Sequence, residues 1–506
     1  MMFNFKLKNK EKQVLNYEGE KAFVLTPKLE LYTAVATAGL SDQFYEKAAD
    51  KLVRIRELIT KNDAAFVAKL AIYAREQMYL RSIPLVLVVE LAKQHKGDAM
   101  VSQLTDRVVQ RADEITELLA YYAMANERKS VKQLNKLSKQ LQKGLAAAFN
   151  KFDEYQFAKY NRDGQVKLKD ALFLVHPKAK DEAQQMLFDK IVKDELQTPF
   201  TWEVELSAVG QQKFDTAELK KAAVKAKWEE LIFSNKMGYM ATMRNLRNIL
   251  EAEVSKQALD KVCAYIADEK AVAKSKQLPF RFLAAYRELK VLNNGRVGKV
   301  LDALEVAVLN SAANIAGYDE NTKVVVAADV SGSMQAPISA KSKVMNFDIG
   351  LMLAMLLQNR CENVITGMFG DTWKVINVAK KNILASVQEF YNREGEVGYA
   401  TNGYLVIKDL LQRRQVVDKV MLFTDGQLWN SNYTGETIAA LWKQYKSLSP
   451  NAKLYLFDLA GHGNTPLNVQ RDDVFLIAGW SDKIFNVLKA IEDGNDAVKM
   501  INSIEL

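Results

Sequence analysis

The strongest fold signal in the sequence is the stretch Val324-Val325-Val326-Ala327-Ala328-Asp329-Val330-Ser331-Gly332-Ser333-Met334. Its first five residues are apolar and either small or β-branched, which is typical of a parallel strand buried on both faces. Gly332 allows a sharp turn at the carboxyl end of this strand, where open α/β sheets place their ligand sites. The stretch therefore predicts a strand that presents Asp329, Ser331 and Ser333 together at a loop.

These three side chains supply one carboxylate and two hydroxyls, which are hard oxygen ligands suited to Mg²⁺ or Mn²⁺ rather than to zinc. Asp, Ser and Gly are also ordinary turn residues, so the motif alone is compatible with a turn of no further function. The motif resembles the metal-ion-dependent adhesion site of a von Willebrand factor A domain. In that family a Thr from a second loop and an Asp after a later strand complete the site, which maps onto Thr401 in segment 398–403 and onto Asp425 after segment 419–424.

The C-terminal region alternates strand-like and helix-like patterns, as βαβ units require. Strands are predicted at 324–328, 363–369, 419–424, 453–459 and 474–478. Helices are predicted at 344–360, 381–392, 403–414, 435–447 and 481–493. We therefore expect residues 319–506 to form one α/β, doubly wound domain, whose size lies within the usual range of about 50–250 residues.

Length and composition indicate a globular chain with more than one domain. The 506 residues are 49% hydrophobic, which is enough to build proper cores. No apolar run reaches the ~18–20 residues of a membrane helix, and the charged N-terminus lacks the apolar segment of a signal peptide. Two cysteines, Cys263 and Cys361, fall in different predicted domains. We expect both to be buried and reduced and the protein to be cytoplasmic.

The net positive charge of the chain comes entirely from the N-terminal region. The chain has 70 Lys and Arg against 61 Asp and Glu; residues 319–506 hold 19 and 21 of these, which leaves 51 against 40 in residues 1–318. The two regions thus carry −2 and +11. A basic surface attracts polyanions, so nucleic acid is the natural partner class, although many Lys-rich helical proteins merely keep their outer faces solvated.

Residues 1–318 read as successive short helices with few strand-like patterns. Leu52, Ile55 and Leu58 share one helix face, and Phe66, Leu70 and Tyr73 share another. Such stripes have to be covered by neighbouring helices, so we expect an all-α, HEAT-like stack of helix pairs. A compact bundle is the alternative, but about 300 residues exceed what one bundle usually covers.

Several segments in this region resemble the TROVE module of the Ro 60-kDa autoantigen family. They are Tyr-Ala-Arg-Glu (73–76) with Arg-Ser-Ile-Pro-Leu (81–85), Lys-Gly-Leu (143–145), Lys-Tyr-Asn-Arg (159–162) with Lys-Asp-Ala-Leu-Phe-Leu-Val-His-Pro-Lys (169–178), Met-Gly-Tyr-Met-Ala-Thr-Met-Arg-Asn-Leu-Arg-Asn (237–248) and Leu-Pro-Phe-Arg-Phe-Leu-Ala-Ala-Tyr (278–286). Each segment alone is a weak signal. Their order, and the von Willebrand A-like domain that follows them, make the resemblance specific and imply a helical-repeat ring in residues 1–318.

The resemblance also implies RNA contacts by a Lys and a His, which map onto Lys159 and His176. The residues agree in kind, because basic and aromatic side chains crowd this stretch and suit phosphate contact and base stacking. The candidates are Lys159, Tyr160, Arg162, Lys169, His176 and Lys178, with Arg244 and Arg247 further along. His176 is equally compatible with a helix end before Pro177, and the two arginines with tethers between helices.

The resemblance implies a non-enzymatic protein that binds small structured non-coding RNA of the Y type and single-stranded 3′ ends of misfolded RNA. Its metal site would face a protein partner, in bacterial relatives an exoribonuclease, in RNA quality control or maturation. We expect a monomer that does not bind membranes. The alternatives are a metal-dependent interaction scaffold without specific RNA binding, and a Mg²⁺-dependent nuclease, which would need a cluster of carboxylates that the helical region does not display.

Overall fold

In the computed structural model the chain forms two compact units, and each unit is made of several segments of the sequence. The sheet unit comprises residues 1–58, 315–480 and 485–498, and the helical unit comprises residues 59–314, 481–484 and 499–506. The structure describes residues 13–38, 48–128, 134, 137–161, 164–277, 279–311, 321–338, 342–377, 382–429, 436–469, 471–479, 488 and 496–506. The junction at residue 315 lies close to the boundary expected at 318–319, but the first 58 residues lie with the sheet.

The sheet unit is built on six strands in the order β5-β4-β3-β6-β7-β9, parallel except at one edge. The strands are β3 (Lys323–Asp329), β4 (Asn363–Phe369), β5 (Trp373–Val375), β6 (Lys419–Thr424), β7 (Lys453–Asp458) and β9 (Val474–Ala478). The five predicted strands are confirmed, because buried parallel strands are nearly continuous apolar runs. The short antiparallel β5 is an addition that has no such run.

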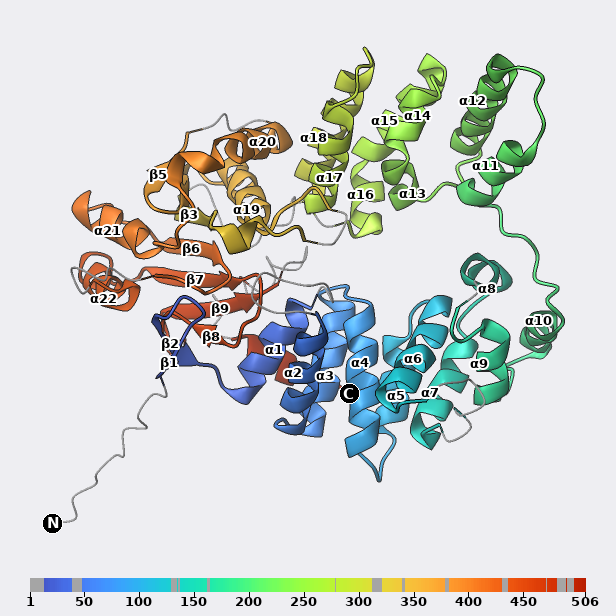
Figure 1. Cartoon of the computed structure of the whole chain (residues 1–506), viewed down its shortest axis with the longest axis horizontal. Coiled ribbons are helices and arrows are strands. Elements are labelled where there is room, and N and C mark those ends of the chain that lie inside the picture. Colours follow the sequence, from blue (N-terminus) through green and yellow to red (C-terminus); the bar gives the residue numbers. More distant parts are fainter. Residues whose placement is uncertain are drawn as a thin grey trace. The chain divides into compact units, whose positions relative to one another are not determined.

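Helices cover both faces of this sheet (Figure 1). They are α19 (Asn346–Arg360), α20 (Ile383–Arg393), α21 (Tyr404–Gln412) and α22 (Ile438–Leu448), with the 3-10 turns η2 (Gly332–Gln335) and η3 (Glu394–Val397). The four lie at the predicted positions to within a few residues. The fifth predicted helix, 481–493, lies outside the described residues apart from position 488.

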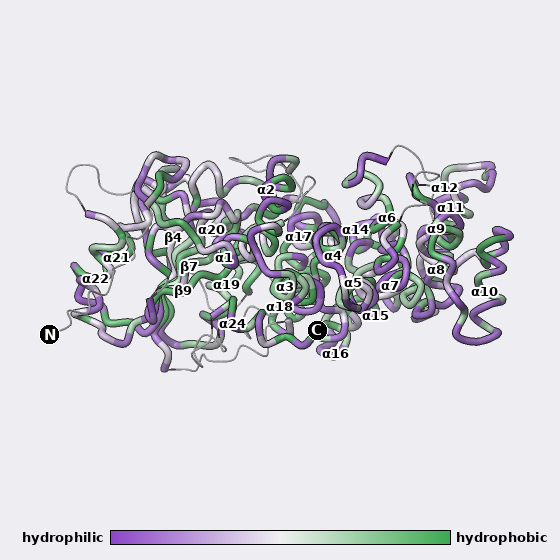
Figure 2. Tube along the Cα trace, turned by 90° about the horizontal axis from the view of Figure 1, so that it is seen from below, coloured by the Kyte–Doolittle hydropathy of each residue, from purple (hydrophilic) through white to green (hydrophobic). Residues whose placement is uncertain are grey.

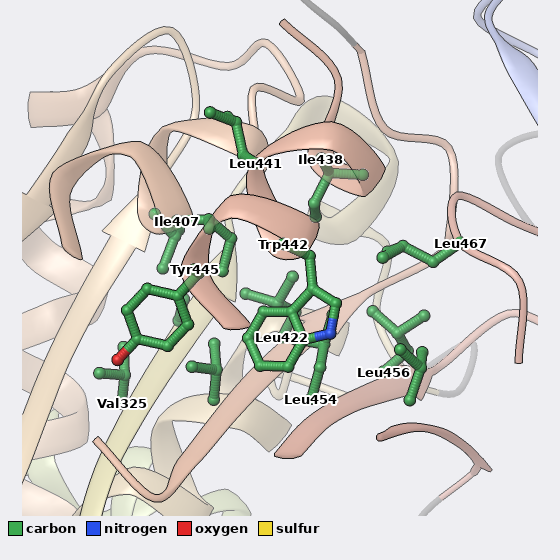
Figure 3. Close-up of a cluster of buried hydrophobic side chains, with 14 of the residues drawn as sticks. Val325, Ile407, Leu422, Ile438, Leu441, Trp442, Tyr445, Leu454, Leu456 and Leu467 are labelled. Atoms are coloured by element: carbon green, nitrogen blue, oxygen red, sulfur yellow. The ribbon is translucent and has the colours of Figure 1, made fainter. Parts of the chain in front are cut away.

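One face of the sheet carries an apolar core beneath α21 and α22 (Figure 3). Trp442 and Tyr445 of α22 are fully buried there against Val325, Leu422 and Leu454 of three adjacent strands. On the other face α19 approaches so closely that a Cβ on Gly350 would lie 2.7 Å from the Phe423 ring. These contacts fix the strands whose ends form the site described below.

The N-terminal segment is part of the sheet unit and is not purely helical. Its elements are β1 (Gln13–Leu15), β2 (Lys21–Val24), α1 (Pro27–Ala36) and α2 (Ala48–Thr60). Strand β2 pairs with β8 (Asn464–Thr465), and Leu25 joins the apolar core beneath α21 and α22. The expectation that residues 1–318 form one all-α module is therefore corrected at its start. Strands of three and four residues become stable only through pairing with β8, far away in the sequence.

The helical unit consists of short helices that pack in pairs. They are α3 (Ala64–Glu76), α4 (Ser82–Gln94), α5 (Met100–Val108), α6 (Ala112–Ala125), α7 (Lys139–Phe149), α8 (Glu154–Tyr160), α9 (Leu168–Val175), α10 (Glu182–Lys193), α11 (Trp202–Gln211), α12 (Ala217–Phe233), α13 (Tyr239–Arg244), α14 (Leu246–Glu251), α15 (Lys256–Ala267), α16 (Glu269–Ser275), α17 (Pro279–Lys290) and α18 (Val297–Ser311). Helix α24 (Ala497–Asn502) runs from the sheet unit into this one. Side chains that accept a bond from the third backbone N–H begin many of the helices, as Asp63 does for α3 and Thr216 for α12.

Two family-like segments have structural roles here. Arg75 and Glu114 form a buried ion pair with 2.8 Å between the guanidinium and carboxylate, and the other carboxylate oxygen accepts from the backbone N–H groups of Gln110 and Arg111 at the start of α6. A Cβ on Gly144 in α7 would lie 2.5 Å from a backbone oxygen of α5, so the two helices touch through glycine. Both segments hold helices together.

Hydropathy follows these arrangements (Figure 2). The strands are coloured largely as hydrophobic, whereas the helices alternate between the two colours, as amphipathic elements do. Within the described part of the chain, no helix combines the length and the apolar character that crossing a membrane takes. Cys263 and Cys361 are both buried, and burial raises the pKa of the Cys263 thiol to about 11.

Candidate functional site

The principal site lies where β3 and β6 end side by side. The chain leaves β3 towards β4 on one side of the sheet and leaves β6 towards β7 on the other, so the two carboxyl ends open a gap between diverging loops. Ligands of open α/β sheets bind at such a switch point. Asp329 is the last residue of β3, and Asp425 directly follows β6.

Asp329 is fully buried and held by neighbouring donors. The backbone N–H of Ser331 donates to one carboxylate oxygen at 2.9 Å, and the Thr424 hydroxyl donates to the other at 2.7 Å. Burial, and next the charge of Asp425, raise the pKa of Asp329 to about 7. The two carboxylates thus lie close together in a buried environment, where their negative charges repel each other.

Asp425 completes a chain of polar contacts across the two loops. Its carboxylate accepts from the backbone N–H of Gln427 at 3.1 Å and from the Ser333 hydroxyl, while the hydroxyls of Ser331 and Ser333 lie 3.3 Å apart. Burial raises the pKa of Asp425, and the nearby carboxylate of Glu18 adds to this effect. The two acids and two serines predicted from the sequence therefore converge.

Thr401 brings a hydroxyl that has no hydrogen-bond partner among the described residues. Its side chain is 3% exposed, and its Oγ1 is buried without a hydrogen bond. The backbone carbonyl of Thr401 accepts from the N–H groups of Gly403 and Trp429, both at 2.9 Å, which fixes the loop on both sides. A buried hydroxyl that lacks a partner is costly, so this position is suited to a ligand that the hydroxyl can contact.

A hollow of about 410 Å³ opens above these hydroxyls. Ser331, Ser333 and Thr401 line it together with three residues that the sequence did not single out: Glu18, Asp371 and Trp429. No pattern in the sequence indicated them, because Glu18 reaches the hollow through the pairing of β2 with β8. Asp371 is held beside the loop of Gly398, whose positive φ of 71° and close approach to that carboxylate require glycine.

The donor set suits a small divalent cation. Two carboxylates and three hydroxyls are hard ligands. Within the described part of the chain, the groups that shift the pKa of the two acids include no cation. Across the described residues no group of three His, Cys, Asp or Glu side chains is placed to hold a metal ion. The site can therefore hold an octahedral ion that relies on hydroxyls and keeps some waters, as Mg²⁺ does.

The second candidate surface lies on α8 in the helical unit. Lys159 is exposed, and its ammonium lies 5.6 Å from the ring centre of Tyr155 and 5.7 Å from that of Tyr160. The guanidinium of Arg111 lies 4.5 Å from the Tyr160 ring while bonding Asp113. Sequence reasoning missed Tyr155 and Arg111, because the first is one helical turn away and the second belongs to another helix.

The neighbouring candidates lie on and after α9. Helices α8 and α9 both pack against α6, so the two basic segments lie on helices that contact the same neighbour. His176 ends α9 in a left-handed conformation with φ of 51°, and its side chain is exposed. Lys178 is exposed and Lys169 half-buried, while Arg162 lies outside the described residues. His176 is thus the helix-end residue before Pro177, and its ring is also accessible to a ligand.

Arg244 and Arg247 have different surroundings although both are exposed. Arg247 pairs with Glu251 at 2.8 Å and reaches Glu288 of α17 at 3.8 Å, so it tethers two helices. Arg244 lies near Arg281 instead: desolvation, and next repulsion from Arg244, lower the pKa of Arg281. Arg244 and Arg281 are two like charges that repel each other, so this pair is a better candidate for binding an anion than Arg247.

Both units are similar to domains of known proteins. Residues 28–218 and 192–315 match the TROVE domain, and residues 323–491 match the Ro60 vWA domain. The crystal structure of the Deinococcus radiodurans RO (RSR) protein has the same fold, with a TM-score of 0.60 and 18% sequence identity over 93% of this chain and 100% of that one.

Sequence similarity to curated proteins is local. Telomerase protein component 1 of Rattus norvegicus is 42% identical over 94 residues, and that of Mus musculus is 40% identical over 97 residues. Each match covers 19% of this chain and only 3% of the length of the relative. The family matches, in contrast, extend over most of both units, and the chain belongs to the Ro60 family of TROVE-domain proteins.

Proposed function

We propose that the chain is an RNA-binding protein whose helical unit holds small structured non-coding RNA of the Y type and the single-stranded 3′ ends of misfolded RNA. Its role would lie in RNA quality control or maturation. Membership of the Ro60 family supports RNA binding in general. The excess of +11 charges in residues 1–318 supports a polyanionic partner.

The observation that carries this proposal is the arrangement of Lys159 with Tyr155 and Tyr160 on α8. A cation beside aromatic rings can bind a phosphate while the rings stack on unpaired bases. The exposed His176 extends this surface, because it ends α9, which packs against α6 as α8 does. Shape and phosphate contacts would set affinity, and unpaired bases would supply sequence preference.

Fluorescence anisotropy with the full-length chain tests this function. A short hairpin RNA with a single-stranded 3′ tail is compared with the same hairpin without the tail and with a duplex DNA of equal length. We expect both RNAs to bind, the tailed one more tightly, with affinity falling steeply as salt rises. Equal binding of all three molecules, or a flat salt titration, would contradict the proposal and favour the scaffold alternative.

We propose in addition that Asp329, Ser331, Ser333, Thr401 and Asp425 hold Mg²⁺, replaceable by Mn²⁺. The unpartnered Thr401 hydroxyl and the two adjacent buried carboxylates support this. A bound ion would supply a positive charge at the hollow that attracts an acidic group. The role is therefore docking of a protein partner, with an exoribonuclease as the family-based candidate, rather than catalysis.

A further inference from the structure

The tip of the β1–β2 hairpin, residues 16–20, is fastened beside the candidate metal site by contacts from three consecutive residues. The Asn16 side chain donates to the Leu428 carbonyl at 3.0 Å, and the Tyr17 N–H donates to the Gln427 side chain at 2.7 Å. Trp429 donates its indole N–H to the Glu18 carboxylate at 2.7 Å. All three partners belong to the loop that follows Asp425.

The hairpin is also held at its base. Phe23 and Val24 of β2 pair with Thr465 and Asn464 of β8. The Gln427 side chain that accepts from Tyr17 donates in turn to the Asp425 carbonyl and to the Asn464 side chain, both at 3.3 Å. The tip is therefore anchored on both sides and does not depend on one contact for its position.

This anchoring places a third carboxylate at the mouth of the site. Glu18 lines the same hollow as Ser331, Ser333 and Thr401 and is half-buried. Trp429 connects it to the site floor, because its backbone N–H donates to the Thr401 carbonyl while its indole holds Glu18. An acid in this place raises the repulsion among carboxylates unless a cation is bound.

The coordination number of the ion suggests a role for Glu18 at this position. An octahedral ion has six positions, and the five side chains of the site fill at most five. A sixth position would then remain for a water or for a ligand that enters through the hollow. Because the described acids are not close enough together for three of them to bind an ion directly, Glu18 would act through a water that the ion retains.

We propose that the residue 16–20 tip is a built-in cap of the metal site, in which Glu18, acting through a water, blocks the position that an acidic side chain of a partner protein would take. This inference rests on the proposed metal site. It makes the site self-occupied in the free protein. A partner gains access to the ion only when its own carboxylate displaces Glu18, so the N-terminal hairpin sets the threshold for docking.

Glu18→Gln in the full-length chain separates this role from a merely structural one. Glutamine retains an oxygen that accepts from the Trp429 indole, so the hairpin contact persists while the charge is lost. Mn²⁺ affinity is measured by isothermal titration calorimetry for the parent, for Glu18→Gln and for Glu20→Gln, the matched change two residues along the same hairpin. We expect about tenfold weaker Mn²⁺ binding for Glu18→Gln alone, as for loss of an outer-shell ligand.

A second arm tests displacement with acetate as a free carboxylate. In Glu18→Gln, acetate should restore Mn²⁺ affinity by filling the vacated place, whereas in the parent it should have little effect; Asp329→Ala reports nonspecific effects. Equal Mn²⁺ affinity of parent and Glu18→Gln, or an equal acetate response in both, would overturn the cap while leaving the metal site standing. A parent that binds no Mn²⁺ would overturn the cap and the metal site together.

Discussion

Each of the two units buries a pair of ionisable side chains. The two groups have opposite charges in one pair and like charges in the other. In the helical unit Arg75 faces Glu114 at 2.8 Å, and both groups also bond backbone atoms. In the sheet unit Asp329 lies beside Asp425, and the described groups that shift the pKa of either are hydroxyl and N–H donors and other carboxylates, without an opposite charge. The first pair is closed by its own chain. The second has the hard oxygen donors of the metal site that we propose, and it would be closed by a cation from outside.

Breaking the closed pair should give the largest effect. In Arg75→Met the buried Glu114 carboxylate loses its principal counter-charge, which costs about 3–5 kcal/mol of folding free energy. Arg81, whose Nε lies 3.5 Å from the same carboxylate, compensates in part, so we expect the lower end of that range. Urea unfolding measures it. The double variant Arg75→Met with Glu114→Gln should recover some stability, and a single variant as stable as the parent would remove the contrast between the pairs.

Breaking the open pair should have the opposite consequence for the metal-free protein. Asp329→Asn removes the repulsion, so stability without metal should stay level or rise, while Mn²⁺ affinity should fall at least a hundredfold, or about 2.7 kcal/mol. Calorimetry and thermal unfolding with and without Mn²⁺ give both quantities. RNA affinity should stay within a factor of about two, because the proposed RNA surface lies on other elements. Unchanged Mn²⁺ binding would refute the site.

The same pair predicts a pH dependence. The folded pKa of Asp329 is raised, so its proton competes with the ion, and Mn²⁺ affinity should decline as the pH falls through about 7. Without metal the sign reverses for stability: the folded state holds its proton more tightly than the unfolded chain, so the free energy of unfolding should decrease as the pH rises from about 4 to 7. A flat profile in both titrations would contradict the burial of two charges.

The exposed surface should respond more weakly than either buried pair. Lys159→Gln with His176→Asn removes the charge and the ring, and asparagine tolerates the left-handed conformation at position 176. Each lost RNA contact should cost at most about 1–3 kcal/mol, and the fold should be unaffected because both side chains are exposed. Hairpin-RNA anisotropy checks this. Parent-like binding by the double variant would show that these two residues do not contact RNA.

Arg247 is the matched control with the smallest expected effect. It is exposed and basic like Lys159, but Glu251 and Glu288 neutralise it. Arg247→Ala should therefore change RNA affinity by less than about 0.5 kcal/mol, within the range of ordinary surface substitutions. A loss as large as that of the double variant would mean that net charge, and not the α8 arrangement, governs binding.

Sequence predicted the sheet far better than the N-terminal segment. The strands that carry Asp329 and Asp425 are continuous apolar runs, and parallel order brings their ends together, so the central site residues could be located in advance. The β1–β2 hairpin could not be, because its strands are short and acquire stability from β8 more than 400 residues later. Glu18 was missed for the same reason.

The helical unit was predictable as a class but not in its surface. Apolar stripes and Asp, Ser or Thr caps announce amphipathic helices. Which basic residues remain available depends on neighbours that come from other helices, as Glu288 does for Arg247. The segments that suggested the family owe part of their character to packing, as the Arg75 bridge and the Gly144 contact show.

The placement of residues 1–58 with the sheet makes residues 59–314, the main part of the helical unit, an insertion within another domain. Asn16 and its partner Leu428 are 412 residues apart, and ribosomes add roughly 5–20 residues per second, so these atoms are synthesised roughly 20–80 s apart. Residues 59–314, the main part of the helical unit, are synthesised during that interval and can begin to fold first. The opening segment of the chain has to wait, with Leu25 and Leu29 uncovered, for the last strands to leave the ribosome. The pairing with β8 that later holds this segment therefore also delays its folding during translation.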